Sequence, residues 1–144
     1  MTQEDKQLLL KDLCARLPYG TLVLFRRPFG GVVIEERVDL TADILKGFIE
    51  DDDIRVRPFL RPISSMIEEE MDKLFDILKI DKDGNEEDWI KINDVLGIEF
   101  FFPSGKWVED VAEAYDYLYS IHIDFRGLIP MGLALEAKEE MYKI

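Results

Sequence analysis

The sequence is poor in the residues on which several classes of small protein depend. It contains one cysteine, so it has no internal disulfide and its stability must come from packing. No apolar run approaches the roughly 18–20 residues that a membrane-spanning helix needs. The first five residues are polar and partly acidic, unlike a secretory signal peptide. We therefore expect a cytoplasmic protein that does not associate with membranes.

Histidine and the familiar catalytic motifs are equally scarce. His122 is the only histidine, so no second histidine is present for a zinc site, and no Gly-x-Ser-x-Gly elbow is present either. Asp124 and Arg126 follow His122 closely, but we expect this histidine to pack or to cap a helix. Gly30-Gly31 lacks the phosphate-binding glycine patterns. The sequence thus predicts no catalytic residue, no cofactor and no metal, and favours a protein that is not an enzyme.

The acidic segment 81–88 resembles the opening of a calcium-binding loop. Asp81, Asp83 and Asn85 occupy the first, third and fifth ligand positions. The sixth position is not glycine, however, and the twelfth is Ile92 instead of a carboxylate. We interpret the segment as a turn in which any cation binding would be incidental.

Acidic residues outnumber basic ones, but unevenly along the chain. The sequence has 31 acidic and 18 basic residues, a net charge of −13. Residues 63–144 hold 20 acidic and eight basic side chains, whereas six of the eight arginines lie between Arg26 and Arg61. The simplest interpretation is one soluble domain, 1–144, with two differently charged faces. The alternative is a subdivision into an arginine-bearing part, 1–62, and an acidic, mainly helical part, 63–144.

The hydrophobic periodicity predicts an α+β fold that begins with a helix. Thr2 and Asp5 match a capping box, and Pro18 and Gly20 end the helix. We place Cys14 on the apolar stripe of this helix and interpret it as a core residue. A second helix is expected from residue 64, where Ser65 and Glu68 match a capping box. A third helix is expected from the apolar stripe at 108–119.

The segment 21–60 predicts a small antiparallel β-meander or a partly open barrel. Four short apolar or alternating segments are expected to form its strands, namely 21–25, 32–38, 44–49 and 54–57. Thr41 is also able to cap a short helix at 44–49, but Gly47 and the flanking segments favour a strand. Further along the chain, 89–92 and 97–102 predict a short β insertion between the two longer helices, and 133–135 is expected to dock on the core.

Two groups of side chains are candidate interaction surfaces. Arginines in the β region are expected to line one of its faces, beside phenylalanines that offer stacking surfaces; they are Arg26, Arg27, Arg55, Arg57 and Arg61. Alternate residues of a strand point to opposite faces, so an aromatic run leaves an exposed aromatic patch unless both faces are covered. The residues of this run and its neighbour are Phe100, Phe101, Phe102 and Trp107.

These features favour a protein-binding or accessory module that is not an enzyme, with a protein partner or self-association as its interaction. The alternative is a nucleic-acid-associated regulator that uses the arginine-bearing β face, although the acidic part of the chain would repel a polyanion. A further alternative is an acidic surface that mimics DNA. An enzyme would instead show a deep pocket around His122.

Three stretches of the chain, 8–20, 58–66 and 122–134, are distinctive in combination. Together they resemble a family of short uncharacterised proteins that is common in gut bacterial genomes and in their phages and mobile elements. The resemblance implies a cytoplasmic protein of phage or mobile-element origin, and it implies no particular chemistry. It also implies that these three stretches matter for the fold.

Overall fold

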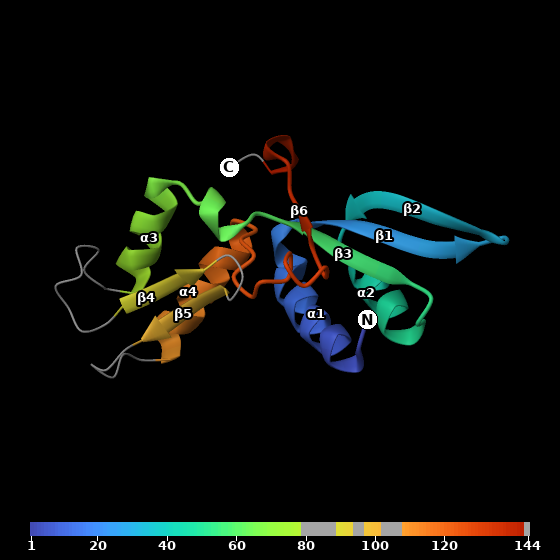
Figure 1. Cartoon of the computed structure of the whole chain (residues 1–144), viewed down its shortest axis with the longest axis horizontal. Coiled ribbons are helices and arrows are strands. Elements are labelled where there is room, and N and C mark those ends of the chain that lie inside the picture. Colours follow the sequence, from blue (N-terminus) through green and yellow to red (C-terminus); the bar gives the residue numbers. More distant parts are fainter. Residues whose placement is uncertain (79–88, 94–96, 102–107, 143–144) are drawn as a thin grey trace. The chain divides into compact units, whose positions relative to one another are not determined.

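The computed structural model in Figure 1 describes the backbone of residues 1–78, 89–93, 97–101 and 108–142, and the side chains of residues 1–78 and 111–142. Helices and a mixed sheet are both present, so the predicted α+β class is confirmed. The chain divides into two compact units. Unit 1 comprises Met1–Leu60 and Leu128–Ile144, and unit 2 comprises Arg61–Gly127.

Unit 1 contains two helices and a four-stranded sheet. Its elements are α1 (Gln3–Arg16), β1 (Leu22–Phe29), β2 (Val32–Asp39), α2 (Ala42–Glu50), β3 (Arg55–Leu60) and β6 (Leu135–Glu136). The strand order is β2-β1-β3-β6, with β1 antiparallel to both of its neighbours and β6 parallel to β3. Because β3 pairs with β1 and not with the preceding strand, this order corrects the expected meander or barrel.

The hairpin of β1 and β2 follows directly from two glycines. Gly30 and Gly31 have φ values of +57° and +83°, which a two-residue type I′ turn requires and glycine adopts without strain. Phe29 therefore pairs with Val32, and the register continues without interruption to Leu22 and Asp39. The predicted strand pair is confirmed, and β1 is longer than the sequence suggested.

The segment 44–49, predicted as a strand, is helical. Thr41 caps α2 by accepting a hydrogen bond of 3.2 Å from the Ile44 amide. Gly47 lies within this helix at a close contact, since an added Cβ would stand 3.2 Å from Cδ1 of Ile54. The glycine that suggested a strand is thus explained by close packing.

One face of the sheet in unit 1 builds the core with the two helices. Leu9 and Leu13 of α1, Phe48 of α2, and Val23 and Val56 of the sheet are all essentially inaccessible to solvent. The expected docking of the C-terminal segment is confirmed, because its buried residues join this core: Leu128, Leu133 and Ala134.

Cys14 is exposed, so its predicted core role is wrong. The predicted Thr2–Asp5 capping box is present, but the buried side of α1 passes through Leu9, Leu13 and Arg16. Arg16 Nε donates a 2.7 Å hydrogen bond to Asp12, and both side chains are fully buried. With Leu9, Leu13 and Arg16 on the buried side of α1, Cys14 lies on its exposed side.

The hydroxyl of Tyr142 joins β1 to β3 where their direct pairing stops. It accepts a 2.8 Å hydrogen bond from the Leu22 amide and donates one of 2.7 Å to the Phe59 carbonyl. The neighbouring Pro58 has no amide hydrogen to offer to the ladder. Burial raises the pKa of Tyr142 to about 12.

Replacing Tyr142 by phenylalanine should lower the free energy of unfolding by about 1–2 kcal/mol, because two backbone groups lose their partner. In the wild type, the neutral phenol should stabilise the fold fully below pH 10 and progressively less between pH 10 and about 12, where the unfolded chain ionises first. Tyr142→Phe should lack this alkaline loss. Urea titrations at several pH values test both effects, with Tyr19→Phe as the control; equal stability of the two variants would contradict the prediction.

The described residues of unit 2 form two α-helices and one pair of antiparallel strands. Its elements are α3 (Glu68–Leu78), β4 (Trp89–Asn93), β5 (Gly97–Phe101) and α4 (Val108–Ser120), with a short 3₁₀ helix at Ile63–Ser65. The predicted β insertion is confirmed, since β4 and β5 pair in antiparallel order, and α3 packs against α4. The Ser65–Glu68 capping box is wrong: the Ser65 hydroxyl donates to the Pro62 carbonyl, and Glu70 accepts from the Ile67 amide.

Candidate functional site

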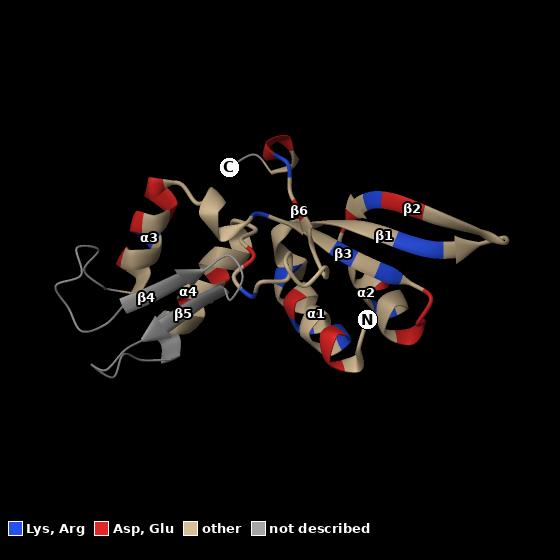
Figure 2. Ribbon diagram, in the orientation of Figure 1, with Lys and Arg blue, Asp and Glu red and all other residues tan. Residues whose placement is uncertain are grey.

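Four arginines lie on the face of the unit 1 sheet opposite its core. The register places Arg26 opposite Arg55, and Leu24 opposite both Arg37 and Arg57. Directly opposed residues of neighbouring strands point to the same face, so these guanidinium groups project together. Figure 2 shows basic residues on β1, β2 and β3. We call this surface, made of Arg26, Arg37, Arg55 and Arg57, the arginine face.

The arginine face carries more positive than negative charge, although the register also places the carboxylates of Glu35 and Asp39 on it, opposite Arg26 and Leu22. Arg26, Arg37 and Arg55 are exposed and Arg57 is half-buried. Within the described part of the chain, none of these guanidinium groups forms an ion pair with a carboxylate. Two like charges directly opposite each other on neighbouring strands are destabilising, as at Arg26 and Arg55. An anion placed between these two strands would relieve that repulsion.

Three shallow hollows meet at Arg55. The first has a volume of 360 Å³ and is lined by Arg26, Pro28, Val33, Asp52, Asp53 and Arg55. The second, of 290 Å³, is lined by Met1, Asp5, Leu9, Arg55, Val56, Arg57, Met131, Gly132 and Leu133. The third, of 260 Å³, is lined by Leu24, Arg26, Arg55, Arg57 and Gly132. The second hollow is the one that combines arginines at its rim with an apolar lining.

Arg27, predicted as part of this surface, points to the other face of the sheet. Neighbouring residues of a strand alternate between faces, so Arg26 and Arg27 are necessarily separated. The Arg27 guanidinium instead lies 5.8 Å from the ring centroids of both Phe25 and Phe29. These distances allow cation–π attraction, which accounts for Arg27 without a partner molecule.

Arg61, also predicted as part of the surface, is an internal structural residue of unit 2. Its two terminal nitrogens donate to the two carboxylate oxygens of Glu70, at 2.7 and 2.8 Å, and also to the carbonyls of Ser65 and Ile121. Burial alone would raise the pKa of Glu70. The hydrogen bonds from Arg61 and the Ile67 amide, with the Arg61 charge, outweigh it and hold that pKa below its ordinary value.

His122 has a structural position in the same unit, as expected from the sequence. It is buried, follows the end of α4, and adopts a φ of +64°, as the residue that ends a helix often does. Its carbonyl accepts a 2.7 Å hydrogen bond from the Arg61 amide, and the Asp124 amide donates one of 2.8 Å to the Arg61 carbonyl. His122 and Arg61 therefore hold the end of α4 beside the start of unit 2.

The predicted aromatic surface and the calcium-like loop cannot be placed. The side chains of Phe100, Phe101, Phe102 and Trp107 lie outside the described residues, and so does the segment 81–88. Among the side chains that are described, no group of three or more His, Cys, Asp or Glu residues is arranged to hold a metal ion.

Arg37 belongs to the arginine face although it was not among the predicted site residues. The signal for it is in the sequence. A two-residue Gly30-Gly31 turn fixes the hairpin register, and that register places Arg37 opposite Leu24, on the side of Arg26. Counting residues along both strands from the turn would therefore have added Arg37 to the predicted surface and removed Arg27 from it.

Comparisons with known proteins add no relative to these observations. No protein-family model, no curated protein and no solved structure matches the chain. Within the described ranges, the helices are too short or too polar to cross a bilayer.

Proposed function

We propose that this protein is a binding module, without catalytic activity, that holds an acidic segment of a protein partner on the arginine face. The observation that supports this most directly is the convergence of Arg26, Arg37, Arg55 and Arg57 on one exposed face. Guanidinium groups bind carboxylates through charge-assisted, often bidentate hydrogen bonds. A partner carboxylate would replace the arginine–arginine opposition across β1 and β3 with attraction.

The second hollow favours a peptide over a nucleic acid. The exposed Met1 and Met131 give it an apolar lining. Arg55 and Arg57 stand at its edge, and Asp5 adds one negative charge. An acidic segment that also carries an apolar side chain matches both parts of this surface. A stacking platform for bases would need several aromatic rings on the arginine face. Phe59 is the aromatic residue that the β3 register places there, and it is half-buried.

The overall charge also disfavours an extended polyanion. Unit 2 holds 17 of the 31 acidic side chains and only seven of the 18 basic ones, and Asp52 and Asp53 border the first hollow. A nucleic acid would be repelled over many phosphates, whereas a short acidic peptide meets only the charges near the arginines, which include Asp5 in the second hollow. Nucleic-acid binding by the same arginines remains the alternative that the experiment must separate.

A fluorescently labelled dodecapeptide of alternating glutamate and leucine should bind the wild type. Arg55→Ala combined with Arg57→Ala should weaken binding by about tenfold or more, because two charge-assisted contacts are lost. Arg27→Ala removes one positive charge from the opposite face and should leave the affinity unchanged. Fluorescence anisotropy measures all three proteins.

A labelled 20-nucleotide single strand, titrated at low and high salt, completes this experiment. Tight oligonucleotide binding that falls steeply with salt and depends on Arg55 and Arg57 would replace the protein partner with a nucleic acid. Absence of binding to both probes, or peptide binding that is insensitive to the arginine substitutions, would overturn the proposal.

A further inference from the structure

The edge strand β2 offers a second surface, independent of any acidic partner. It is the terminal strand in the order β2-β1-β3-β6, and β1 is its only strand neighbour in the described part of the chain. Its eight residues contain no proline, and the register with β1 has no bulge. Since peptide groups alternate in direction along an antiparallel strand, half of those in β2 point away from β1. Such an edge is able to accept another strand.

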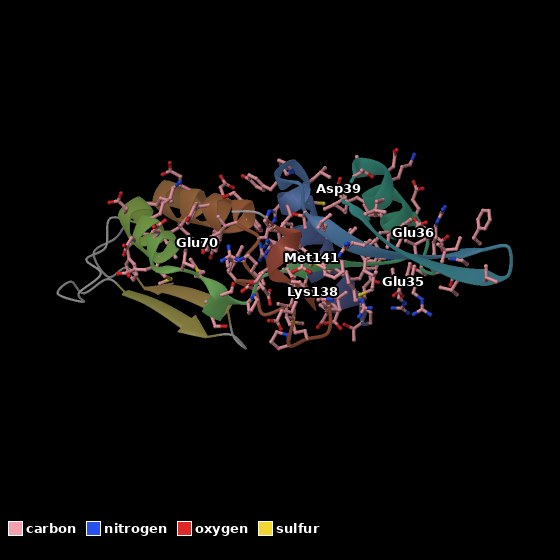
Figure 3. All side chains as sticks on the ribbon, turned by 90° about the horizontal axis from the view of Figure 1, so that it is seen from above. Glu35, Glu36, Asp39, Glu70, Lys138 and Met141 are labelled. Atoms are coloured by element: carbon pink, nitrogen blue, oxygen red, sulfur yellow. The ribbon has the colours of Figure 1, made fainter. Side chains whose placement is uncertain are left out.

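The side chains of β2 match a second copy of β2 in one antiparallel register. If two strands meet about a two-fold axis at Glu36, Glu35 of each copy lies opposite Arg37 of the other, and Ile34 opposite Val38. Two ion pairs and two apolar pairs then form by symmetry. Glu35, Glu36 and Arg37 are exposed, and Figure 3 labels the two glutamates on β2.

The two neighbouring registers bring less favourable side-chain pairs together. An axis at Glu35 places that residue opposite itself and Glu36 opposite Ile34, while an axis at Arg37 opposes two arginines and sets Glu35 against Asp39. The register centred on Glu36 opposes Glu36 with its symmetry mate and sets Val33 opposite Asp39 at each end, but it is the one of the three that forms ion pairs. The charge pattern thus selects one pairing.

We propose that two copies of this chain associate through antiparallel pairing of their β2 strands in the register centred on Glu36. A two-fold axis perpendicular to the sheet keeps each face continuous across the pair. The sheets would join edge to edge, and the arginine faces of both copies would lie on the same side. The dimer would therefore present Arg26, Arg55 and Arg57 of both copies on one side, while Arg37 of each copy pairs with Glu35 of the other.

Analytical ultracentrifugation over a concentration series tests this pairing. The wild type should show a concentration-dependent dimer. Arg37→Glu should weaken dimerisation by about tenfold or more, because both ion pairs become repulsive. Lys46→Glu, on the exposed side of α2, gives the same change in net charge away from β2 and should have little effect. Glu36→Thr should strengthen the dimer by removing the one repulsive contact.

Two charge variants mixed together give the decisive result. Glu35→Arg alone and Arg37→Glu alone should each dimerise poorly, whereas an equimolar mixture should dimerise like the wild type, since each strand then complements the other. Far-UV circular dichroism verifies that both variants fold. A wild type that stays monomeric up to about 1 mM, or a mixture no better than its components, would overturn the proposal.

Discussion

Replacing Glu70 by glutamine should lower the free energy of unfolding by about 3 kcal/mol, at the lower end of the range for breaking a buried ion pair. The Arg61 side chain is 14% exposed and the Glu70 side chain 6%, so the remaining guanidinium charge would have little access to water. Glutamine keeps the shape of Glu70 and its ability to accept from the Ile67 amide. The loss of unfolding free energy therefore measures the effect of removing the Glu70 charge. Urea denaturation followed by circular dichroism measures it.

Glu69→Gln is the matched control, because it makes the same substitution one residue earlier at an exposed position of α3 and should change stability by less than about 0.5 kcal/mol. The pKa of Glu70 lies below its ordinary value of 4.5, so its stabilising contribution is complete above that pH and is lost as the pH falls through the folded pKa. The difference between wild type and Glu70→Gln should shrink on acidification. A difference that grows in acid would contradict this account of the pair.

Replacing Phe48 by alanine should cost about 3–5 kcal/mol, the usual loss for an aromatic residue in a packed core. Phe48 is fully buried on α2 and contacts the core of unit 1, while Lys6 Nζ lies 5.1 Å from its ring centroid. The ring fills space between helix and sheet that alanine would leave empty. Thermal and urea denaturation of the full chain measure the loss.

The control for Phe48 is its neighbour Ile49, which is 54% exposed. Ile49→Ala should cost less than about 1 kcal/mol, because little apolar surface is removed from contact with the protein. The helical assignment also predicts that Leu45, three residues before Phe48 and buried beside it, resembles Phe48 in its sensitivity. Sensitivity at both Phe48 and Ile49 would contradict the packing of α2.

Signals confined to a few neighbouring residues predicted the structure well. Thr2 and Asp5 form the capping box that their spacing indicates, and Gly30-Gly31 forms the expected turn. The strands at 89–93 and 97–101 and the helix at 108–120 also follow from local patterns. For the capping box and the glycine turn, the deciding interaction lies within the element itself, so a local sequence pattern is enough to predict it.

The sequence-based predictions were wrong where contacts with other elements of the fold decide the structure. Gly47 lies in a helix at a close contact with Ile54, a residue outside that helix. Cys14 faces water because the core of unit 1 packs on the side of α1 that carries Leu9 and Leu13. The bridge made by Tyr142 between Leu22 and Phe59 spans 120 and 83 residues of sequence, which no local pattern encodes. These are tertiary contacts, which can override or add to the intrinsic helix and strand propensities of the residues.

The candidate site was predicted in part for the same reason. Arg26, Arg55 and Arg57 share a face because alternate residues of a strand point the same way. The same alternation places Arg27 on the opposite face. Arg61 ends in the interior of unit 2 because Glu70, nine residues later, supplies a buried carboxylate. A charge run shows which residues carry charge, but the register decides which of them act together.

The parallel pairing of β6 with β3 has a consequence for biosynthesis. A ribosome produces residues 1–60 first, then all of unit 2, and only then the segment 128–142 that completes the core and the sheet of unit 1. During that interval the nascent chain exposes the outer edge of β3 and the apolar surface that Leu133 and Ala134 later cover. Unit 1 therefore reaches its native state after translation of unit 2, and a cell must keep the nascent edge of β3 from pairing with other chains in the meantime.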